Sequence, residues 1–369
     1  MNQDVKEIYH HFCAEGSWLN GNPAGSGHIH GTWLIRTIEK DKPDYILQQI
    51  NHHVFPAVPE MMENIRKVTS HIKKKRRDAP QGDLLEIIHT IDGKSYYTSP
   101  EGDYWRMYRK LEPGLSYDIV PGSGVAREAG KAFGQFIDDL SDMNPDELFP
   151  VIPDFHSIVM RFGKFNAAVE ADPCGRAAGT GKEISFALEA FERLKVIAEM
   201  EKQGKIPVRI THNDTKLNNV LFGHDGKAVC VIDLDTVMPG LSLYDFGDSI
   251  RTVTNTSLED EADLKKVQFD IGVFKAYTEG FLEKTSPLLA AEELQFLPLS
   301  AQYMTYIMGI RFLTDYLEGD IYYRIKDATQ NLRRCRTQFR LMECLSDACH
   351  ECIDIVNQTF EKHKSATGH

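Results

Sequence analysis

Long apolar runs and an excess of basic residues are both missing from this sequence. No stretch approaches the length of a membrane-spanning helix, and the segment from Met1 to Phe12 lacks the basic-then-apolar order of a secretion signal. The formal net charge is −12, from 42 Lys and Arg against 54 Asp and Glu. Nucleic acids and anionic membranes require a broad basic surface. We therefore expect a cytoplasmic protein with neither kind of partner, and a neutral or cationic small molecule suits its charge better.

Cysteine is also scarce, and its spacing resembles no disulfide framework. The seven cysteines are odd in number, which indicates reduced thiols in a reducing compartment. Cys344, Cys349 and Cys352 cluster with His350, but this run lies in a helical pattern without the turn residues or second cysteine pair of a zinc site. We interpret the cluster as packed helix residues.

The first third of the chain has the pattern of strands and turns with one inserted helix. Thr32 to Ile38 and Tyr45 to Gln49 are rich in β-branched and aromatic residues and predict a hairpin. The apolar spacing of Val58 to Arg77 predicts a helix that ends in a basic run. Leu84 to His89 and Tyr104 to Leu111 are further strand candidates, separated by an Asp-Gly turn.

After Pro113-Gly114 the pattern becomes mainly helical, so we place a boundary between residues 1–113 and 114–369. A chain of 369 residues exceeds what one core usually organises, and two lobes that share a cleft are expected. The predicted fold class is α+β. The helical segments are Arg127 to Ser141, Phe155 to Ala171, Glu183 to Gln203 and most of Leu264 to Glu361. Short strands interrupt them at Val208 to Ile210, Val220 to Phe222 and Val229 to Ile232.

The most informative motif lies among these short strands. His212, Asp214 and Asn219 have the spacing His-x-Asp-x-x-x-x-Asn of a kinase catalytic loop, and Asp233 follows at the end of a strand. A solvated polar loop is the alternative interpretation. It becomes improbable because Ile232-Asp-Leu-Asp235 and Asp245-Phe-Gly-Asp248 accompany the loop on a strand-loop-strand pattern.

Phosphoryl transfer depends on alignment and on neutralising oxygen charge more than on covalent chemistry. We predict Asp214 as the catalytic base and Lys216 as a cation near the transferred group. Asn219 and Asp233 are predicted Mg²⁺ ligands, and Asp235 either contacts a second Mg²⁺ or fixes the loop.

Two supporting roles complete this prediction. His212 is expected to pack and hydrogen-bond behind the loop. Asp245 and Asp248 are expected to cap or anchor the following helix and to brace the loop, without touching substrate.

A glycine-rich loop precedes the first predicted strand. Gly25, Ser26 and Gly27 are placed to cover nucleotide phosphates, and His28 to contact the acceptor or a phosphate. An ordinary hairpin turn is the alternative. This loop makes residues 1–113 the nucleotide-covering lobe and residues 114–369 the catalytic and substrate-binding lobe.

The grip on the nucleotide departs from that of protein kinases. Gln48 stands where a third-strand lysine is expected, so that either this glutamine or another basic residue holds the phosphates. Backbone groups of Arg109 and Leu111, in the segment crossing between lobes, are expected to bind the base.

The chain resembles the N-acetylhexosamine 1-kinases of the aminoglycoside-phosphotransferase and choline-kinase family. The segments that carry the resemblance are Gly27–Ile29, Tyr45–Gln49, Thr211–Asn219, Ile232–Thr236, Asp245–Arg251 and Asp315–Tyr322. The resemblance implies a bilobal protein-kinase-like fold and ATP-dependent, Mg²⁺-assisted phosphorylation of the anomeric hydroxyl of N-acetylglucosamine or N-acetylgalactosamine. It implies that Asp214 is the base, that Asn219 and Asp233 bind metal, and that His28, Arg311 and Tyr322 contact the sugar.

Spacing gives partial support for those sugar contacts. Arg311, Asp315, Glu318 and Tyr322 recur at intervals of four, three and four, so a continuous helix presents all of them on one face. A sugar needs many hydrogen-bonding partners, although an exposed face with ion pairs gives the same spacing. Thr252-Val253 stands where these sugar kinases carry an aromatic residue, which leaves the sugar preference open.

Two other functions are compatible with the same residues. One is a kinase for another small alcohol, such as an aminoglycoside, choline or homoserine. The other is a regulator that binds nucleotide without catalysis, and the intact Asp214, Asn219 and Asp233 argue against it.

Overall fold

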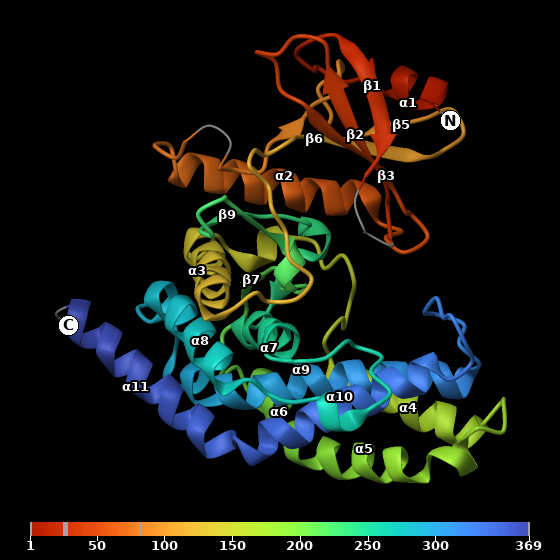
Figure 1. The fold of residues 1–369 in the computed structure, drawn as a ribbon, viewed down its shortest axis with the longest axis vertical. Coiled ribbons are helices and arrows are strands. Elements are labelled where there is room, and N and C mark those ends of the chain that lie inside the picture. Colours follow the sequence, from red (N-terminus) through yellow and green to blue (C-terminus); the bar gives the residue numbers. More distant parts are fainter. Residues whose placement is uncertain (1, 25–28, 81–82, 368–369) are drawn as a thin grey trace.

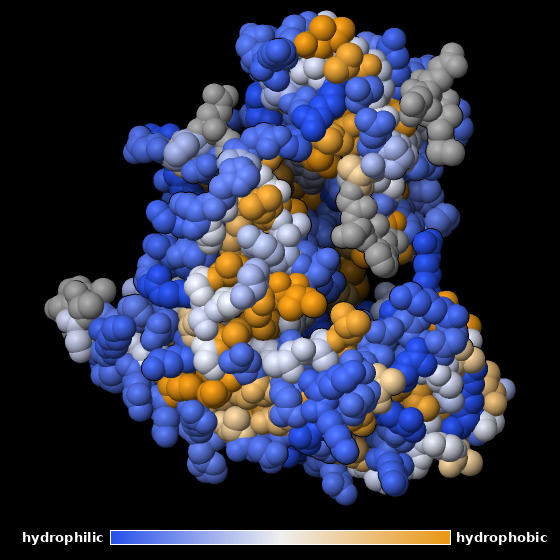
Figure 2. Space-filling model, in the orientation of Figure 1, coloured by the Kyte–Doolittle hydropathy of each residue, from blue (hydrophilic) through white to orange (hydrophobic). Residues whose placement is uncertain are grey.

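The protein folds into a small sheet-containing lobe and a larger helical lobe (Figure 1). The computed structural model describes residues 2–24, 29–80 and 83–367. On the face shown in Figure 2, hydrophilic residues cover most of both lobes and the surface is hollowed between them. The predicted α+β class is confirmed. Within the described residues, no helix is both long and apolar enough to cross a membrane.

The small lobe is built on an antiparallel sheet. Its strand order is β1–β2–β3–β6–β4, and β5 also pairs with β6. The strands are β1 (Trp18–Pro23), β2 (Gly31–Thr37), β3 (Tyr45–Ile50), β4 (Ile87–Ile88), β5 (Tyr97–Thr98) and β6 (Tyr104–Arg109). The predicted hairpin is confirmed as β2 and β3. The sequence did not predict β1, because its Asn-Gly-Asn-Pro run is typical of a turn.

Two helices cover the two faces of this sheet. On one face α1 (Asn2–Tyr9) packs its Ile8 against Leu47 and Met107. On the other, α2 (Val58–Lys75) packs Met62 with Tyr108, in a cluster that continues into the large lobe. The second cluster therefore fixes the small lobe on the catalytic segment.

The large lobe is helical around a few short strands. Its helices are α3 (Ser123–Asp139), α4 (Ile158–Ala171), α5 (Gly181–Leu194), α6 (Val196–Lys202), α7 (Ser242–Val253), α8 (Ile271–Thr285), α9 (Ala291–Glu318), α10 (Gln330–Asp347) and α11 (Cys349–Thr367). The predicted single helix from Glu183 to Gln203 is wrong in one respect, because it breaks at Lys195 into α5 and α6. No Gly or Pro marks this break.

The three predicted strands of the large lobe are confirmed, and with β10, which the sequence did not predict, they form two small antiparallel pairs. β7 (Arg209–Thr211) pairs with β10 (Met238–Gly240), and β8 (Val220–Phe222) pairs with β9 (Ala228–Val231). Because β8 and β9 form a hairpin, the loop before β8 and the segment after β9 lie together. The catalytic motif occupies both.

The helices around this island pack closely where they carry glycine. A Cβ atom at Gly280 of α8 would overlap the carbonyl oxygen of Arg127 on α3, and one at Gly130 of α3 would overlap that of Tyr277. The two helices therefore approach backbone to backbone. Helix α3 in turn contacts the catalytic loop, because its Phe133 and Phe136 pack against the ring of His212.

The chain crosses between the lobes after β6. Leu115, in this connection, bridges to Phe222 of β8 through two backbone hydrogen bonds. The boundary that we predict after Pro113 lies in the same connection and stays a prediction.

Candidate active site

The catalytic loop is held from behind by carboxylates of α7. Asp245 accepts hydrogen bonds from the backbone N–H groups of His212, at 2.9 Å, and Asn213, at 2.7 Å. Asp248 accepts one from the N–H of Thr215, at 3.1 Å. The predicted bracing is confirmed. The predicted capping is wrong, because both acidic residues lie inside α7.

His212 has the structural role that its position in the motif predicts. Its ring is fully buried and packs edge-on against Phe133 and Phe136 of α3. Nδ1 accepts a hydrogen bond from the N–H of Asp214, so the ring proton lies on Nε2, which donates to the carbonyl oxygen of Ile232 at 2.9 Å. The ring thereby joins the loop to the segment that carries Asp233.

The structure brings Asp214, Lys216 and Asn219 together. The Lys216 Nζ lies 2.8 Å from Oδ1 of Asp214, and the Asn219 amide donates to the backbone and side-chain oxygens of Asp214 at 2.8 and 3.3 Å. Burial is the largest influence on the pKa of the Asp214 carboxyl and opposes its ionisation, but the charge and hydrogen bond of Lys216, together with neighbours such as Arg251, outweigh burial and lower that pKa. Asp214 is therefore ionised at neutral pH and able to accept a proton.

Asp233 is a carboxylate without a polar partner in the part of the chain that the structure describes. Its backbone is left-handed, with φ 62° and ψ 58°, a conformation that Asp tolerates better than most residues. Within the described residues it forms no hydrogen bond or ion pair, although it opens into the solvent of the cleft. Although the residue is exposed, the surrounding protein removes part of the hydration of its carboxylate; this desolvation, and then the charges of Asp235 and Asp214, raise its pKa to about 6.

These features fit a divalent cation. A bound cation would relieve the repulsion that raises the pKa of Asp233. Because Nδ2 of Asn219 donates to Asp214, the side-chain oxygen of Asn219 is left as a ligand. A carboxylate and an amide oxygen are donors that Mg²⁺ prefers.

Asp235 has different partners. Its Oδ2 lies 2.5 Å from Nε2 of His30 and 3.0 Å from Nη2 of Arg106, whose Nη1 contacts Oδ1. Burial opposes ionisation, but Arg106 and His30 together outweigh it and hold the pKa of Asp235 well below its usual range. Of the two predicted roles, a fixing contact is the one that these hydrogen bonds describe. Metal ligation by Asp235 stays a prediction.

Only some of the residues that we predict to contact the nucleotide belong to the described part of the chain. Gly25, Ser26, Gly27 and His28 lie outside the described residues. Gln48 donates to Oγ1 of Thr32 and accepts from Nε of Arg106, its cross-strand neighbour on β6.

The two predicted base contacts also differ from each other. The N–H of Arg109 donates to the carbonyl oxygen of Glu86 and is not free for a base. Leu111 is 4% exposed, and no hydrogen bond to its amide occurs in the part of the chain that the structure describes.

Arg311 and Tyr322 meet, but not as the predicted helix face. Helix α9 ends at Glu318, because Gly319 adopts a left-handed C-cap with φ 97°. The following loop returns, and Asp315 accepts from the N–H of Tyr322 at 2.7 Å. The Arg311 guanidinium then lies 5.9 Å from the centroid of the Tyr322 ring.

A second arginine accompanies Arg311. Arg161 of α4 donates to the carbonyl oxygen of Phe155 at 2.9 Å, and the Phe155 ring lies 5.6 Å from the Arg311 guanidinium. Burial, and then the charge of Arg311, lower the pKa of Arg161 to about 10. Among the described residues, no carboxylate lies within ion-pair distance of either arginine. This group of Arg161, Arg311, Phe155 and Tyr322 is called the arginine cluster below.

His156 connects the arginine cluster to the catalytic loop. Its Nε2 lies 2.9 Å from the carbonyl oxygen of Asn213, next to Asp214, and its Nδ1 has no hydrogen-bond partner among the described residues. Burial is the main cause that lowers its pKa from 6.5 to about 4, and Arg311 and Arg161 add to the effect. His156 is therefore a neutral donor at neutral pH.

The buried, neutral His156 makes the fold sensitive to acid. The unfolded chain takes up a proton below pH 6.5 and the folded protein only near pH 4, so stability present at neutral pH is lost as the pH falls between them. We expect His156 to contribute about 2 kcal/mol to the difference in unfolding free energy between pH 7.5 and pH 5. Urea unfolding of His156→Gln should show a flatter dependence. His224→Gln, at an exposed turn residue, should behave as the unchanged protein does; an equal slope in all three would contradict the prediction.

Sequence reasoning missed four of these residues. Arg106 had a usable signal, because it is a charged residue between the aromatic and apolar residues of a strand, opposite Gln48. His30 lies next to the glycine-rich loop, and the sequence analysis assigns a contact in this region to His28 and none to His30. His156 and Arg161 carry no local signal.

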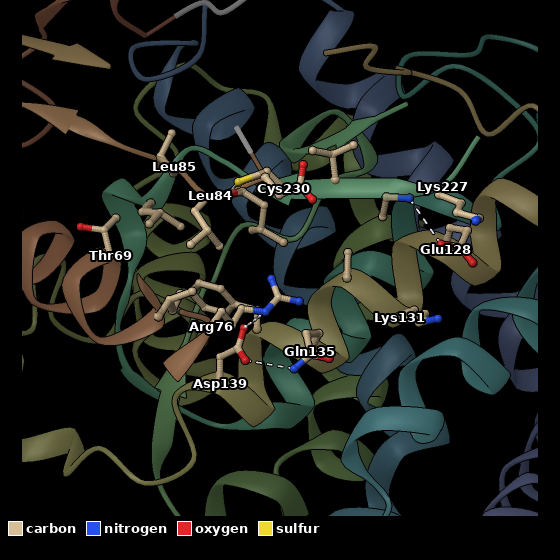
Figure 3. Close-up of a pocket in the computed structure, with 18 residues that line it drawn as sticks. Thr69, Arg76, Leu84, Leu85, Glu128, Lys131, Gln135, Asp139, Lys227 and Cys230 are labelled. Carbon is tan, nitrogen blue, oxygen red and sulfur yellow. Dashed lines mark hydrogen bonds and ion pairs between the residues drawn. The ribbon is translucent and has the colours of Figure 1, made fainter. Parts of the chain in front are cut away.

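A cavity of about 210 Å³ lies between α2, α3 and β9 (Figure 3). Its lining includes Cys230, Leu234 and Asp139, and the Asp139 carboxylate is held by Gln135 at 3.0 Å and Arg76 at 3.4 Å. No residue of the catalytic motif that carries a predicted chemical role is among the described residues that line it. This cavity is therefore separate from the site of Asp214 and Asp233.

Comparison with known families gives one match that spans most of the chain. Residues 21–277 match the family model APH, described as "Phosphotransferase enzyme family". The match includes the catalytic loop, Asp233 and α7, and it ends before Arg311.

Solved structures with the same fold cover nearly the whole chain. The microcompartment-associated aminopropanol kinase superposes with a TM-score of 0.65 at 12% identity, covering 95% of this chain and 98% of that one. Amicoumacin kinase in complex with AMP-PNP, Ca²⁺ and Ami gives a TM-score of 0.60 at 12% identity, covering 92% of this chain and 93% of that one. Choline kinase from Cryptosporidium parvum gives 0.54 at 13%, covering 92% and 93%. At these identities the likeness establishes the fold alone, which is the bilobal, protein-kinase-like one.

Proposed function

The chain belongs to the phosphotransferase enzyme family, and on this premise we propose that it transfers the terminal phosphoryl group of ATP to the anomeric hydroxyl of an N-acetylhexosamine. N-acetylglucosamine and N-acetylgalactosamine are the proposed acceptors, and ADP and the sugar 1-phosphate the products. The observation that carries the choice of acceptor is the arginine cluster, which places positive charge and aromatic rings beside the catalytic loop.

The residues of the catalytic loop have complementary roles in this reaction. Asp214 accepts the proton of the sugar hydroxyl as the new oxygen–phosphorus bond forms and the bond to the ADP oxygen breaks. Lys216, which contacts Asp214, offsets negative charge on the phosphoryl oxygens. Asn219 and Asp233 would hold Mg²⁺, which supplies further charge neutralisation when bound.

The arginine cluster favours a neutral acceptor over a cationic one. Several structural relatives are named for amine-bearing substrates such as aminopropanol and choline. An ammonium group is bound well by acidic or aromatic surroundings, but Arg311 and Arg161 would repel it. The carbonyl oxygen of an N-acetyl group accepts hydrogen bonds from a guanidinium, and a sugar ring stacks on an aromatic side chain such as Tyr322.

A panel of acceptors tests this proposal. We expect ADP release with both N-acetylhexosamines. With glucosamine, whose ammonium replaces the N-acetyl group, kcat/KM should fall by at least about 100-fold. Phosphorus NMR should show phosphate at the anomeric oxygen. Turnover confined to amines such as choline or an aminoglycoside would favour the second candidate, a kinase for another small alcohol. Nucleotide binding without turnover of any acceptor would favour a regulator.

A further inference from the structure

We propose that Arg106 is the cation that holds the nucleotide phosphates in this protein, in place of the lysine that Gln48 replaces on β3. In this assignment Asp235 is the counter-ion that positions Arg106. The inference rests on the proposed use of a nucleoside triphosphate and is independent of the acceptor. Gly25 to His28, outside the described residues, are not needed for it.

The position of Arg106 supports this role. It lies on β6 directly opposite Gln48, so its side chain and that of Gln48 point to the same face of the sheet. That face looks toward Asp235 of the large lobe. The side chain of Arg106 reaches across the seam between the lobes to Asp235. If Asp233 binds the Mg²⁺ of a nucleotide, the phosphates of that nucleotide lie at the same seam.

The guanidinium is held in one orientation. Its Nε donates to Oε1 of Gln48 at 2.9 Å, and its two terminal nitrogens donate to the two oxygens of Asp235. The side chain is 1% exposed, and Met62 lies 3.9 Å from Nη1. A guanidinium has five N–H groups, and these contacts use four. One Nη2 hydrogen has no acceptor among the described residues and is left for a phosphate oxygen.

Electrostatics supports the same assignment. Asp214, Asp233 and Asp235 place three carboxylates at the seam, and the phosphates of a nucleotide add more negative charge. Arg106 pairs with both oxygens of Asp235, two residues after Asp233, so its positive charge lies at this group of carboxylates. The other arginines of the small-lobe strands pair with acidic residues of the small lobe itself, Arg36 with Asp44 and Arg109 with Glu86 and Glu15, and not with Asp235 at the seam.

His30 ties the nucleotide-covering segment to the same carboxylate. Nδ1 of His30 accepts a hydrogen bond from the N–H of Asn51 at 3.0 Å, so the ring donates through Nε2 to Asp235. Asp235 thus positions both Arg106 and the residue that leads into β2. A protein kinase pairs its phosphate-binding lysine with a glutamate of the small-lobe helix; in this chain the counter-ion comes from the large lobe.

Nucleotide binding to Arg106→Gln tests the proposal, with calorimetry of MgATP, MgADP and adenosine. Loss of one charge-assisted contact to phosphate should weaken MgATP by about 30-fold and leave adenosine within about threefold. Arg106→Lys should recover part of the MgATP affinity. Arg36→Gln, at an exposed arginine on β2, should bind all three ligands as the unchanged protein does.

A double variant separates phosphate binding from a purely structural tie between lobes. Arg106→Gln leaves Asp235 buried and unpaired, so Arg106→Gln/Asp235→Asn removes both charges and keeps hydrogen-bonding groups. We expect the double variant to bind adenosine with the affinity of the unchanged protein and MgATP about 30-fold more weakly. Recovered MgATP affinity, or an equal loss for adenosine and MgATP, would overturn the proposal. None of these measurements uses a sugar, so failure of the proposed acceptor would not affect the outcome.

Discussion

Replacement of Asp214 with Asn should lower kcat by about 1,000-fold, within the range that positioned general bases contribute. The amide keeps the shape of the carboxylate but cannot accept the proton of the acceptor hydroxyl. Lys216 and Asn219, which contact Asp214, would remain in place. MgATP affinity should change little, because the proposed contact of Asp214 is with the acceptor and not with the nucleotide. The measurement is steady-state ADP release, paired with calorimetry of MgATP.

The matched control for this variant is Asp225→Asn. Asp225 lies in the turn between β8 and β9, is exposed, and accepts from the N–H of Lys227, a bond that Asn also makes. It should retain full activity. A rate for Asp214→Asn equal to that of the unchanged protein would refute the assignment of the base.

Replacement of Asp233 with Asn should remove most activity for a different reason. The unpartnered carboxylate is the strongest oxygen ligand available at the site, and an amide carries no charge to offset that of Mg²⁺. We expect kcat/KM for MgATP to fall by about 1,000-fold. The stabilisation that Mg²⁺ and ADP together give in thermal unfolding should fall nearly to that of ADP alone.

Asp233→Glu separates metal binding from a general loss of charge. Glu keeps the carboxylate but moves it by one methylene, so a higher Mg²⁺ requirement with partial activity is expected. An unchanged dependence of rate on Mg²⁺ in Asp233→Asn would contradict the role of this residue. In that event Asp235 would become the candidate ligand.

The catalytic loop could be predicted from sequence because its parts are close along the chain. Asp214 and Asn219 share one loop, and Asp233 follows the next hairpin, so spacing alone places them together. Most strands and the long helix of the small lobe could be predicted for the same reason, because periodicity depends on residues that are neighbours in the sequence.

The partners of Asp235 could not be predicted in this way. Arg106 and His30 lie 129 and 205 residues away from it. They reach Asp235 only because the sheet register sets Arg106 beside Gln48 and because the two lobes dock. Both conditions depend on tertiary packing, which no single-sequence pattern contains.

For the predicted acceptor contacts, Arg311 and Tyr322, helical periodicity gave the right pair of residues but the wrong local structure. The periodicity of Arg311 to Tyr322 correctly grouped two residues that meet, but the continuous helix it assumed ends at Gly319. The contact arises because Asp315 captures the returning backbone.

That capture by Asp315 has an evolutionary consequence. The ring of Tyr322 is carried on a short loop that is held by the Asp315 carboxylate and by the pairing of Asp320 with Arg176, whereas Asp214 and Asp233 belong to a separately braced framework. Exchange of residues 319–329 for a loop of another sequence should therefore alter which compound is accepted without dismantling the machinery of transfer. New substrate ranges could arise in this lineage by variation of that one segment.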